Sequence, residues 1–141
     1  MQTATKTVIA LDVGTSRIGV ALSNVEARLA HPLTTLNAAT ALSDLKDILE
    51  DHHVAAIVVG WPRGLAGQVT EQTQTTQDFI KMLHQHFDVP IYKQDEAVTS
   101  RQAEAELKTR GKPYKRSDID ALAATYILED FLRDNEEVIN G

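Results

Sequence analysis

Residues 8–21 of the chain read VIALDVGTSRIGVA, two apolar runs separated by a Gly-Thr-Ser turn. Apolar, β-branched runs on either side of a short turn are typical of two antiparallel strands. We therefore predict strands over residues 6–13 and 17–23, followed by a weaker strand over residues 30–36. The N-terminal third of the chain is expected to be a three-stranded antiparallel meander.

The rest of the chain alternates between helical and strand patterns. Apolar residues recur at helical spacing in residues 41–52 and 70–87, while residues 54–60 and 89–94 read as strands. Two more helices are predicted over residues 99–110 and 117–133, the second with Ser117 as its N-cap. Because helices that connect strands make those strands parallel, the order βββαβαβαα predicts an α/β fold. It is a mixed five-stranded sheet, three antiparallel strands extended by two parallel ones, with helices on both faces.

Length and composition indicate a small soluble protein. With 141 residues and no cysteine, we expect a single domain over residues 1–141, in which residues 135–141 form a frayed tail. The first residues are polar, unlike a signal peptide, and the longest apolar run, residues 54–59, is far shorter than the roughly 20 residues that span a bilayer. We therefore expect a cytoplasmic protein with no membrane partner.

The charges are unevenly distributed. Fourteen Lys and Arg against twenty Asp and Glu give a net charge of -6, which disfavours indiscriminate binding of nucleic acid. One basic cluster is nevertheless present, and it comprises Lys108, Arg110, Lys112, Lys115 and Arg116. We interpret this cluster as a contact surface for the phosphates of a nucleic acid, the alternative being a solvated loop.

Acidic residues lie at the predicted ends of three elements. Asp12 stands inside an apolar strand, where a charge is costly without partners, although it could also be a turn residue before Gly14. Asp95 and Glu96 follow the last predicted strand, at the edge where open α/β sheets bind ligands, although both could cap the next helix. These positions suggest a set of converging carboxylates.

The last predicted helix carries two candidates near its start. Asp120 shares a helix face with the small residues Ala123 and Ala124, so its carboxylate is expected to point toward the sheet, whereas Asp118 lies on the flank. Ser117 and Asp120 also have the spacing of a capping box, which is the structural alternative. Carboxylates combined with water and phosphate oxygens suit Mg²⁺ or Mn²⁺, and two such ions can assist hydrolysis.

Residues 14–21 open like a phosphate-binding P-loop, but Val20 and Ala21 stand where that motif requires Lys and Ser or Thr. The segment also lies between two predicted strands, so its glycines fit a tight hairpin better. A nucleotide-binding module of the actin-like and sugar-kinase type is a further alternative, and it requires a second lobe that 141 residues do not provide.

The sequence resembles the YqgF family, also called RuvX, over essentially its whole length. The matching segments are residues 11–21, 31–33, 57–62, 95–96 and 120–124. The resemblance implies an RNase H-like fold and a nuclease whose acidic site falls on Asp12, the Asp95-Glu96 pair and Asp120. Where the family has an arginine after Asp-Glu, this chain has Ala97, and Arg101 is the nearest replacement.

These observations lead to one functional hypothesis with two rivals. The chain is expected to be a metal-dependent endonuclease, a hydrolase of phosphodiester bonds, with Asp12, Glu96 and Asp120 as catalytic ligands of Mg²⁺ or Mn²⁺. Asp95 and Asp118 are the second-choice metal ligands. Arg17 and Arg101 are added to the basic cluster as nucleic-acid contacts. The resemblance implies the substrate: the expected one is the 5′ end of precursor 16S rRNA, in ribosomal precursor particles, and the alternative is a Holliday junction cut by a monomer or a homodimer. The third reading is a catalytically silent nucleic-acid-binding protein.

Overall fold

The computed structural model describes residues 6–24, 29–62, 70–95 and 100–135. The strands are β1 (Thr7–Val13), β2 (Arg17–Asn24), β3 (Leu29–Asn37), β4 (Val54–Trp61) and β5 (Ile91–Asp95). The helices are α1 (Ala41–Asp51), α2 (Glu71–His86), α3 (Ser100–Thr109) and α4 (Arg116–Asp134), with a short 3-10 helix, η1 (Ala38–Thr40), before α1. The predicted element order is therefore confirmed.

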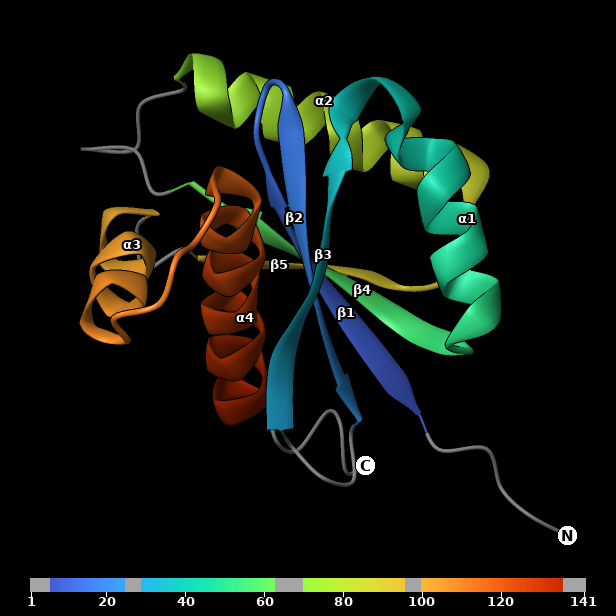
Figure 1. Cartoon of the computed structure of the whole chain (residues 1–141). Coiled ribbons are helices and arrows are strands. Elements are labelled where there is room, and N and C mark those ends of the chain that lie inside the picture. Colours follow the sequence, from blue (N-terminus) through green and yellow to red (C-terminus); the bar gives the residue numbers. More distant parts are fainter. Residues whose placement is uncertain (1–5, 25–28, 63–69, 96–99, 136–141) are drawn as a thin grey trace, which may run out of the picture.

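The five strands form one mixed sheet in the order β3-β2-β1-β4-β5 (Figure 1). Strand β1 is antiparallel to β2 and parallel to β4, while β2 pairs antiparallel with β3 and β4 pairs parallel with β5. The segment between β1 and β2 is a tight hairpin, closed by a 2.9 Å hydrogen bond from the Gly14 amide to the Arg17 carbonyl. The mixed sheet predicted from the sequence is confirmed, and the P-loop-like spacing serves this hairpin.

Helices cover both faces of the sheet (Figure 1). One face is buried under α1 and α2, where Leu45 and Leu83 pack with Ile9 and Leu11 of β1. The other face is buried under α4, whose Ala124 and Leu128 pack with residues such as Ala10. Helix α3 packs on α4 through Ala103 and Leu107. Because side chains alternate along β1, Asp12 belongs to the α4 face with Ala10.

The backbone of α4 lies directly against Gly19 of β2. A Cβ atom added to Gly19 would overlap the carbonyl oxygen of Asp120, so any other residue would push the helix off the sheet. Gly19 is the register partner of Asp12 on β1. The close approach therefore places the start of α4 next to the strand position that carries Asp12.

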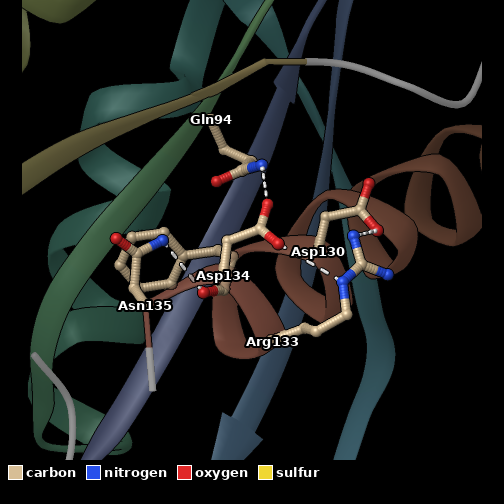
Figure 2. A network of polar contacts seen from close by, with 6 residues as sticks. Gln94, Asp130, Arg133, Asp134 and Asn135 are labelled. Atoms are coloured by element: carbon tan, nitrogen blue, oxygen red, sulfur yellow. Dashed lines mark hydrogen bonds and ion pairs between the residues drawn. The ribbon is translucent and has the colours of Figure 1, made fainter. Parts of the chain in front are cut away.

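Helix α4 is also tied to the sheet near both of its ends. At its start, the Thr35 hydroxyl of β3 donates a 2.6 Å hydrogen bond to the carbonyl of Ser117. Near its end, the Gln94 amide of β5 donates to the carboxylate of Asp134 at 3.1 Å (Figure 2), and Tyr92 contacts the ring of Phe131. The helix therefore crosses the sheet from β3 to β5 in a defined position.

Figure 2 shows that the end of α4 is organised by Arg133, which pairs with Asp130 at 3.1 Å and with Asp134 at 3.3 Å. These two carboxylates raise the pKa of the Arg133 guanidinium, which stays charged in any case. Because the arginine side chain is 69% exposed, these pairs orient Asp134 toward Gln94 more than they stabilise the fold.

In the part of the chain that the structure describes, none of the helices has the length and apolar character needed to span a membrane.

The tight contact at Gly19 leads to a stability prediction. Gly19→Ala is expected to lower the free energy of unfolding by about 2 kcal/mol or more, because the added methyl group meets backbone that cannot rotate away. Gly111→Ala is the matched comparison, since that site is open but has φ +71°. It should lose only about 1 kcal/mol, the cost of the left-handed backbone. Urea denaturation of both variants checks the difference, and equal losses would contradict the packing argument.

Candidate functional site

Asp12 and Asp120 line one cleft at the hairpin end of the sheet. We call it the acidic cleft; its volume is about 400 Å³, and it is bounded by Asp12, Val13, Gly14, Thr15, Ser16, Arg17, Gln72, Arg116 and Asp120. Asp12 is contributed by β1 and Asp120 by the second turn of α4. Two carboxylates from distant parts of the chain thus share one half-buried, polar surface.

Arg17 is the partner of Asp120. Its Nε atom lies 2.6 Å from a carboxylate oxygen of Asp120, and the two side chains are 41% and 16% exposed. The short distance fits a charge-assisted hydrogen bond, which orients the aspartate in the cleft. Arg17 begins β2 directly after the hairpin turn. The turn residues therefore line the cleft and also position the Arg17 guanidinium beside it.

Two more arginines surround the same aspartate. Arg101 of α3 and Arg116 of α4 line a neighbouring hollow of about 320 Å³ together with Arg17 and Asp120. Three guanidinium groups and two carboxylates, those of Asp120 and Glu104, line this hollow, so positive charge is in slight excess there although the net charge of the chain is -6. Such a region attracts phosphate groups.

Helix α2 approaches the cleft through Gln72. The Thr70 hydroxyl caps this helix by accepting from the Thr73 amide at 3.1 Å, as the hydroxyl at that position suggests. The Gln72 amide donates to the carbonyl of Val13, next to Asp12. Sequence reasoning missed Gln72, because a polar residue in the first turn of a helix carries no signal of a contact with a remote strand.

Of the two adjacent acids predicted at the end of β5, the structure describes only Asp95. Asp95 is the last residue of β5 and is the register partner of Trp61, which packs on the α1 and α2 side of the sheet. Gln94 points to the opposite face, toward α4 (Figure 2). Asp95 therefore faces away from Asp12 and Asp120. Glu96, the other predicted ligand, and Ala97 lie outside the described residues.

The start of α4 differs from the prediction. The helix begins one residue earlier, with Lys115 rather than Ser117 as N-cap, and the Asp118 carboxylate accepts a 2.8 Å hydrogen bond from the Lys115 amide. Asp118 is therefore the capping acid, and Asp120 takes part in the ion pair instead. The prediction of Ser117 as the cap was wrong because Asp118, three residues after Lys115, accepts from the Lys115 amide and so fixes the start of the helix before Ser117.

The basic cluster surrounds the connection between α3 and α4. Lys108, Lys112, Lys115 and Arg116 are exposed, and Arg110 pairs with Glu106 one helical turn earlier at 2.7 Å. Arg110 and Lys112 border a larger pocket of about 570 Å³ beside the acidic cleft. The cluster is thus on the α4 face, the same side of the molecule as Asp12 and Asp120.

Ionisable groups with clear pKa shifts lie where α3 packs on α4. Burial and a hydrogen bond to Glu106 raise the pKa of Tyr126 to about 12. Desolvation and the 3.0 Å bond to Glu104 raise the pKa of Tyr114. Burial also raises the pKa of Glu129, an effect that Asp130 reinforces. Both tyrosines are therefore neutral hydrogen-bond donors at physiological pH, and they help to fix α3 beside the cleft.

The chemistry of the acidic cleft fits a hard divalent cation. Carboxylate oxygens are the protein ligands that Mg²⁺ and Mn²⁺ prefer, and the Asp120 carboxylate already holds one cation, the guanidinium of Arg17. Among residues 6–24, 29–62, 70–95 and 100–135, no three His, Asp or Glu side chains are close enough to hold an ion together. Asp12 and Asp120 are the two carboxylates that line the acidic cleft.

Solved structures with a similar fold include Holliday junction resolvases. RuvC of T. thermophilus in complex with a Holliday junction substrate has a TM-score of 0.56 at 18% identity, with 92% of this chain and 96% of that chain covered. The yeast mitochondrial resolvase Ydc2 has a TM-score of 0.54 at 10% identity, with 94% and 82% covered. The fold is thus RNase H-like, the class to which these resolvases belong.

Sequence comparison narrows this class to one family. The profile of the RuvX family, described as Holliday junction resolvase, matches residues 6–134, so the chain belongs to that family. A relative from Roseiflexus sp. (strain RS-1), provisionally named a pre-16S rRNA nuclease, is 42% identical over 131 residues, covering 89% of this chain and 92% of its own. A relative of the same name from Rickettsia felis is 39% identical over 129 residues, covering 88% and 84%.

The different partners of Asp118 and Asp120 lead to a second prediction. Asp118→Ala is expected to lower the free energy of unfolding by about 1 kcal/mol, because the Lys115 amide loses its cap. Asp120→Ala should cost less, about 0.5 kcal/mol, because it removes an ion pair whose arginine remains solvated. Urea denaturation near neutral pH measures both, and a larger loss for Asp120→Ala would make Asp120 a structural residue.

Proposed function

We propose that this protein is a metal-dependent endonuclease that hydrolyses phosphodiester bonds. The observation that carries the proposal is the acidic cleft, in which Asp12 and Asp120 meet beneath a rim of arginines. Carboxylates alone would repel a nucleic acid, and arginines alone would only bind it. Their combination suits a site that holds phosphate next to a cation-binding group.

We propose Asp12, Glu96 and Asp120 as the ligands of Mg²⁺ or Mn²⁺. Glu96 is preferred to Asp95 because Asp95 lies on the other face of the sheet, and Asp118 is set aside because its carboxylate caps α4. When bound, two such ions activate the attacking water and stabilise the leaving oxygen.

The remaining groups of the cleft would position the substrate. Arg17, Arg101 and Arg116 are within one continuous surface around Asp120 and would bind the phosphates that flank the cut bond. Gln72 holds the start of α2 against Val13 and so fixes the wall of the cleft beside Asp12. Arg101 would supply the charge of the arginine that Ala97 replaces.

The substrate that we favour is the 5′ end of precursor 16S rRNA, processed in ribosomal precursor particles in the cytoplasm. The names of the relatives from Roseiflexus and Rickettsia support it. The second candidate is a Holliday junction, supported by the description of the family. A four-way junction has two equivalent strands to cut, so this activity would require a homodimer, whereas a monomer suffices for RNA.

Cleavage assays with both substrates test the proposal. Wild-type protein with Mg²⁺ or Mn²⁺ should cut precursor 16S RNA more efficiently than a four-way DNA junction, and EDTA should abolish cutting. Asp12→Asn and Asp120→Asn are each expected to reduce the rate at least about 100-fold, because an amide supplies no charge to the metal.

Asp118→Asn is the matched control for these variants, since it changes an acid two positions from Asp120 that faces away from the cleft. It should cut at nearly the wild-type rate. Full activity of Asp12→Asn would contradict the ligand assignment, and binding without cleavage by wild-type protein would favour the catalytically silent reading.

The basic cluster leads to a prediction about salt. Replacing Arg110 and Lys112 by alanine should weaken binding of all sequences alike and flatten the slope of log affinity against log salt by about one unit per lost phosphate contact. Lys46→Ala on α1, an exposed lysine on the other face, is the control and should leave the slope unchanged. Fluorescence anisotropy over a salt series measures both, and an unchanged slope in the double variant would place the nucleic acid elsewhere.

A further inference from the structure

The largest of these three cavities lies beside the acidic cleft. It has a volume of about 570 Å³ and is enclosed by β3, by the connection between α3 and α4, and by the first two turns of α4. We call it the flanking pocket. Its size falls within the range of pockets that hold small organic ligands, and it exceeds the volume of the acidic cleft.

The floor of the flanking pocket is apolar. Leu107, Ala121 and Leu122 form it, and each of them is at most 8% exposed. Pro32 of β3 and Pro113 of the connection also line the pocket, and their rings are stiff apolar surfaces. A flat, apolar group of moderate size would therefore find apolar side chains to pack against.

The rim of the same pocket is basic. Arg110 and Lys112 line it, and the only acid that borders it, within the described residues, is Asp118. The Asp118 charge is already used at the start of α4, where it accepts from the Lys115 amide. The Glu106 partner of Arg110 is solvent-exposed, and exposed pairs of this kind are weak enough for a phosphate to replace them. The pocket thus combines an apolar floor with an anion-binding rim.

The flanking pocket and the acidic cleft meet at the first turn of α4. Arg116 lines the cleft and the next residue, Ser117, lines the pocket. Thr35, which also lines the pocket, holds this turn through its hydrogen bond to the Ser117 carbonyl. An extended strand bound in the cleft would reach the pocket with an adjacent nucleotide.

We propose that the flanking pocket binds one unpaired nucleotide of the substrate strand, with its base on the apolar floor and its phosphate between Arg110 and Lys112. The proposal rests on the proposed function and adds a substrate requirement to it. A base stacked in a duplex cannot enter such a pocket, so the substrate must have a single-stranded or displaced nucleotide next to the cleavage position.

The test uses a single-stranded oligonucleotide with one abasic position, moved stepwise along the strand, in RNA and DNA versions. Binding is measured by fluorescence anisotropy with EDTA present, so that no cleavage interferes. For wild-type protein, one abasic position should weaken binding about tenfold, since the stacking of a single base is lost there. The other positions should have little effect.

Two variants fill the pocket in different ways. Thr34→Trp adds a large ring from the exposed β3 wall, and Ala121→Leu adds bulk at the floor. Both should bind the intact oligonucleotide as weakly as wild-type protein binds the abasic one, and both should lose the discrimination between the two. His31→Trp, on the same strand but outside the pocket lining, is the matched control and should behave like the wild type.

Lys112→Ala separates the rim from the floor. It should weaken binding of intact and abasic oligonucleotides by the same factor, because only the phosphate contact is lost. A free mononucleotide should compete far more weakly than the oligonucleotide, since most of the phosphate contacts lie in the neighbouring cleft. Equal competition by the mononucleotide would overturn the proposal.

The outcomes also distinguish this proposal from the proposed function. The pocket proposal is supported if wild-type protein distinguishes intact from abasic oligonucleotides and the pocket-filling variants do not. This holds even if wild-type protein cuts neither substrate and the nuclease assignment fails. Metal-dependent cleavage with no sensitive abasic position overturns the pocket and leaves the nuclease assignment standing. Discrimination that survives in both Thr34→Trp and Ala121→Leu overturns the pocket as well.

Discussion

The contact between the bare Cα of Gly19 and the carbonyl of Asp120 is the constraint on which the arrangement of the site depends. Helix α4 can rest on β2 at this point only because no side chain intervenes. The same contact sets the distance of the Asp120 backbone from the sheet. Because Gly19 is the register partner of Asp12, it also sets the position of Asp120 relative to Asp12. The acidic cleft therefore results from backbone packing, and the Arg17 ion pair refines an arrangement that the glycine makes possible.

Much of the fold was predictable because each element has its own periodicity. Apolar runs of strand type and helical spacing gave the correct order, and the small-residue face of Ala123 and Ala124 correctly indicated that Asp120 turns inward. The N-cap of α4 was not predictable. Lysine is an unfavourable N-cap residue, and Lys115 takes this position only because its amide donates to the Asp118 carboxylate. A sequence pattern indicates which residues favour an N-cap position, but it does not decide between two neighbouring candidates.

The long-range polar contacts were beyond prediction for a related reason. The bond from Thr35 to Ser117 and the bond from Gln72 to Val13 join elements that are distant in the chain. Both are made by common polar residues at exposed-looking positions, which have no periodic signature. Such contacts depend on how the helices and strands pack against one another. That packing depends in turn on side-chain volume, as at Gly19, where the absence of a side chain lets α4 approach β2. Site walls are therefore harder to predict than site acids.

The two outer strands of the sheet have consequences for how the molecule resists self-association. Strand β3 contains Pro32, which has no amide hydrogen to offer to another strand, and its register with β2 shifts between Val20 and Ala21. Strand β5 has only five residues, and Lys93 on it lies 4.3 Å from the Trp61 ring centroid. A proline, an irregular register and a charged residue on a short strand are the features by which natural sheets prevent edge-to-edge aggregation. Within the described residues, both borders of the sheet therefore carry features that oppose pairing with the edge of a second sheet.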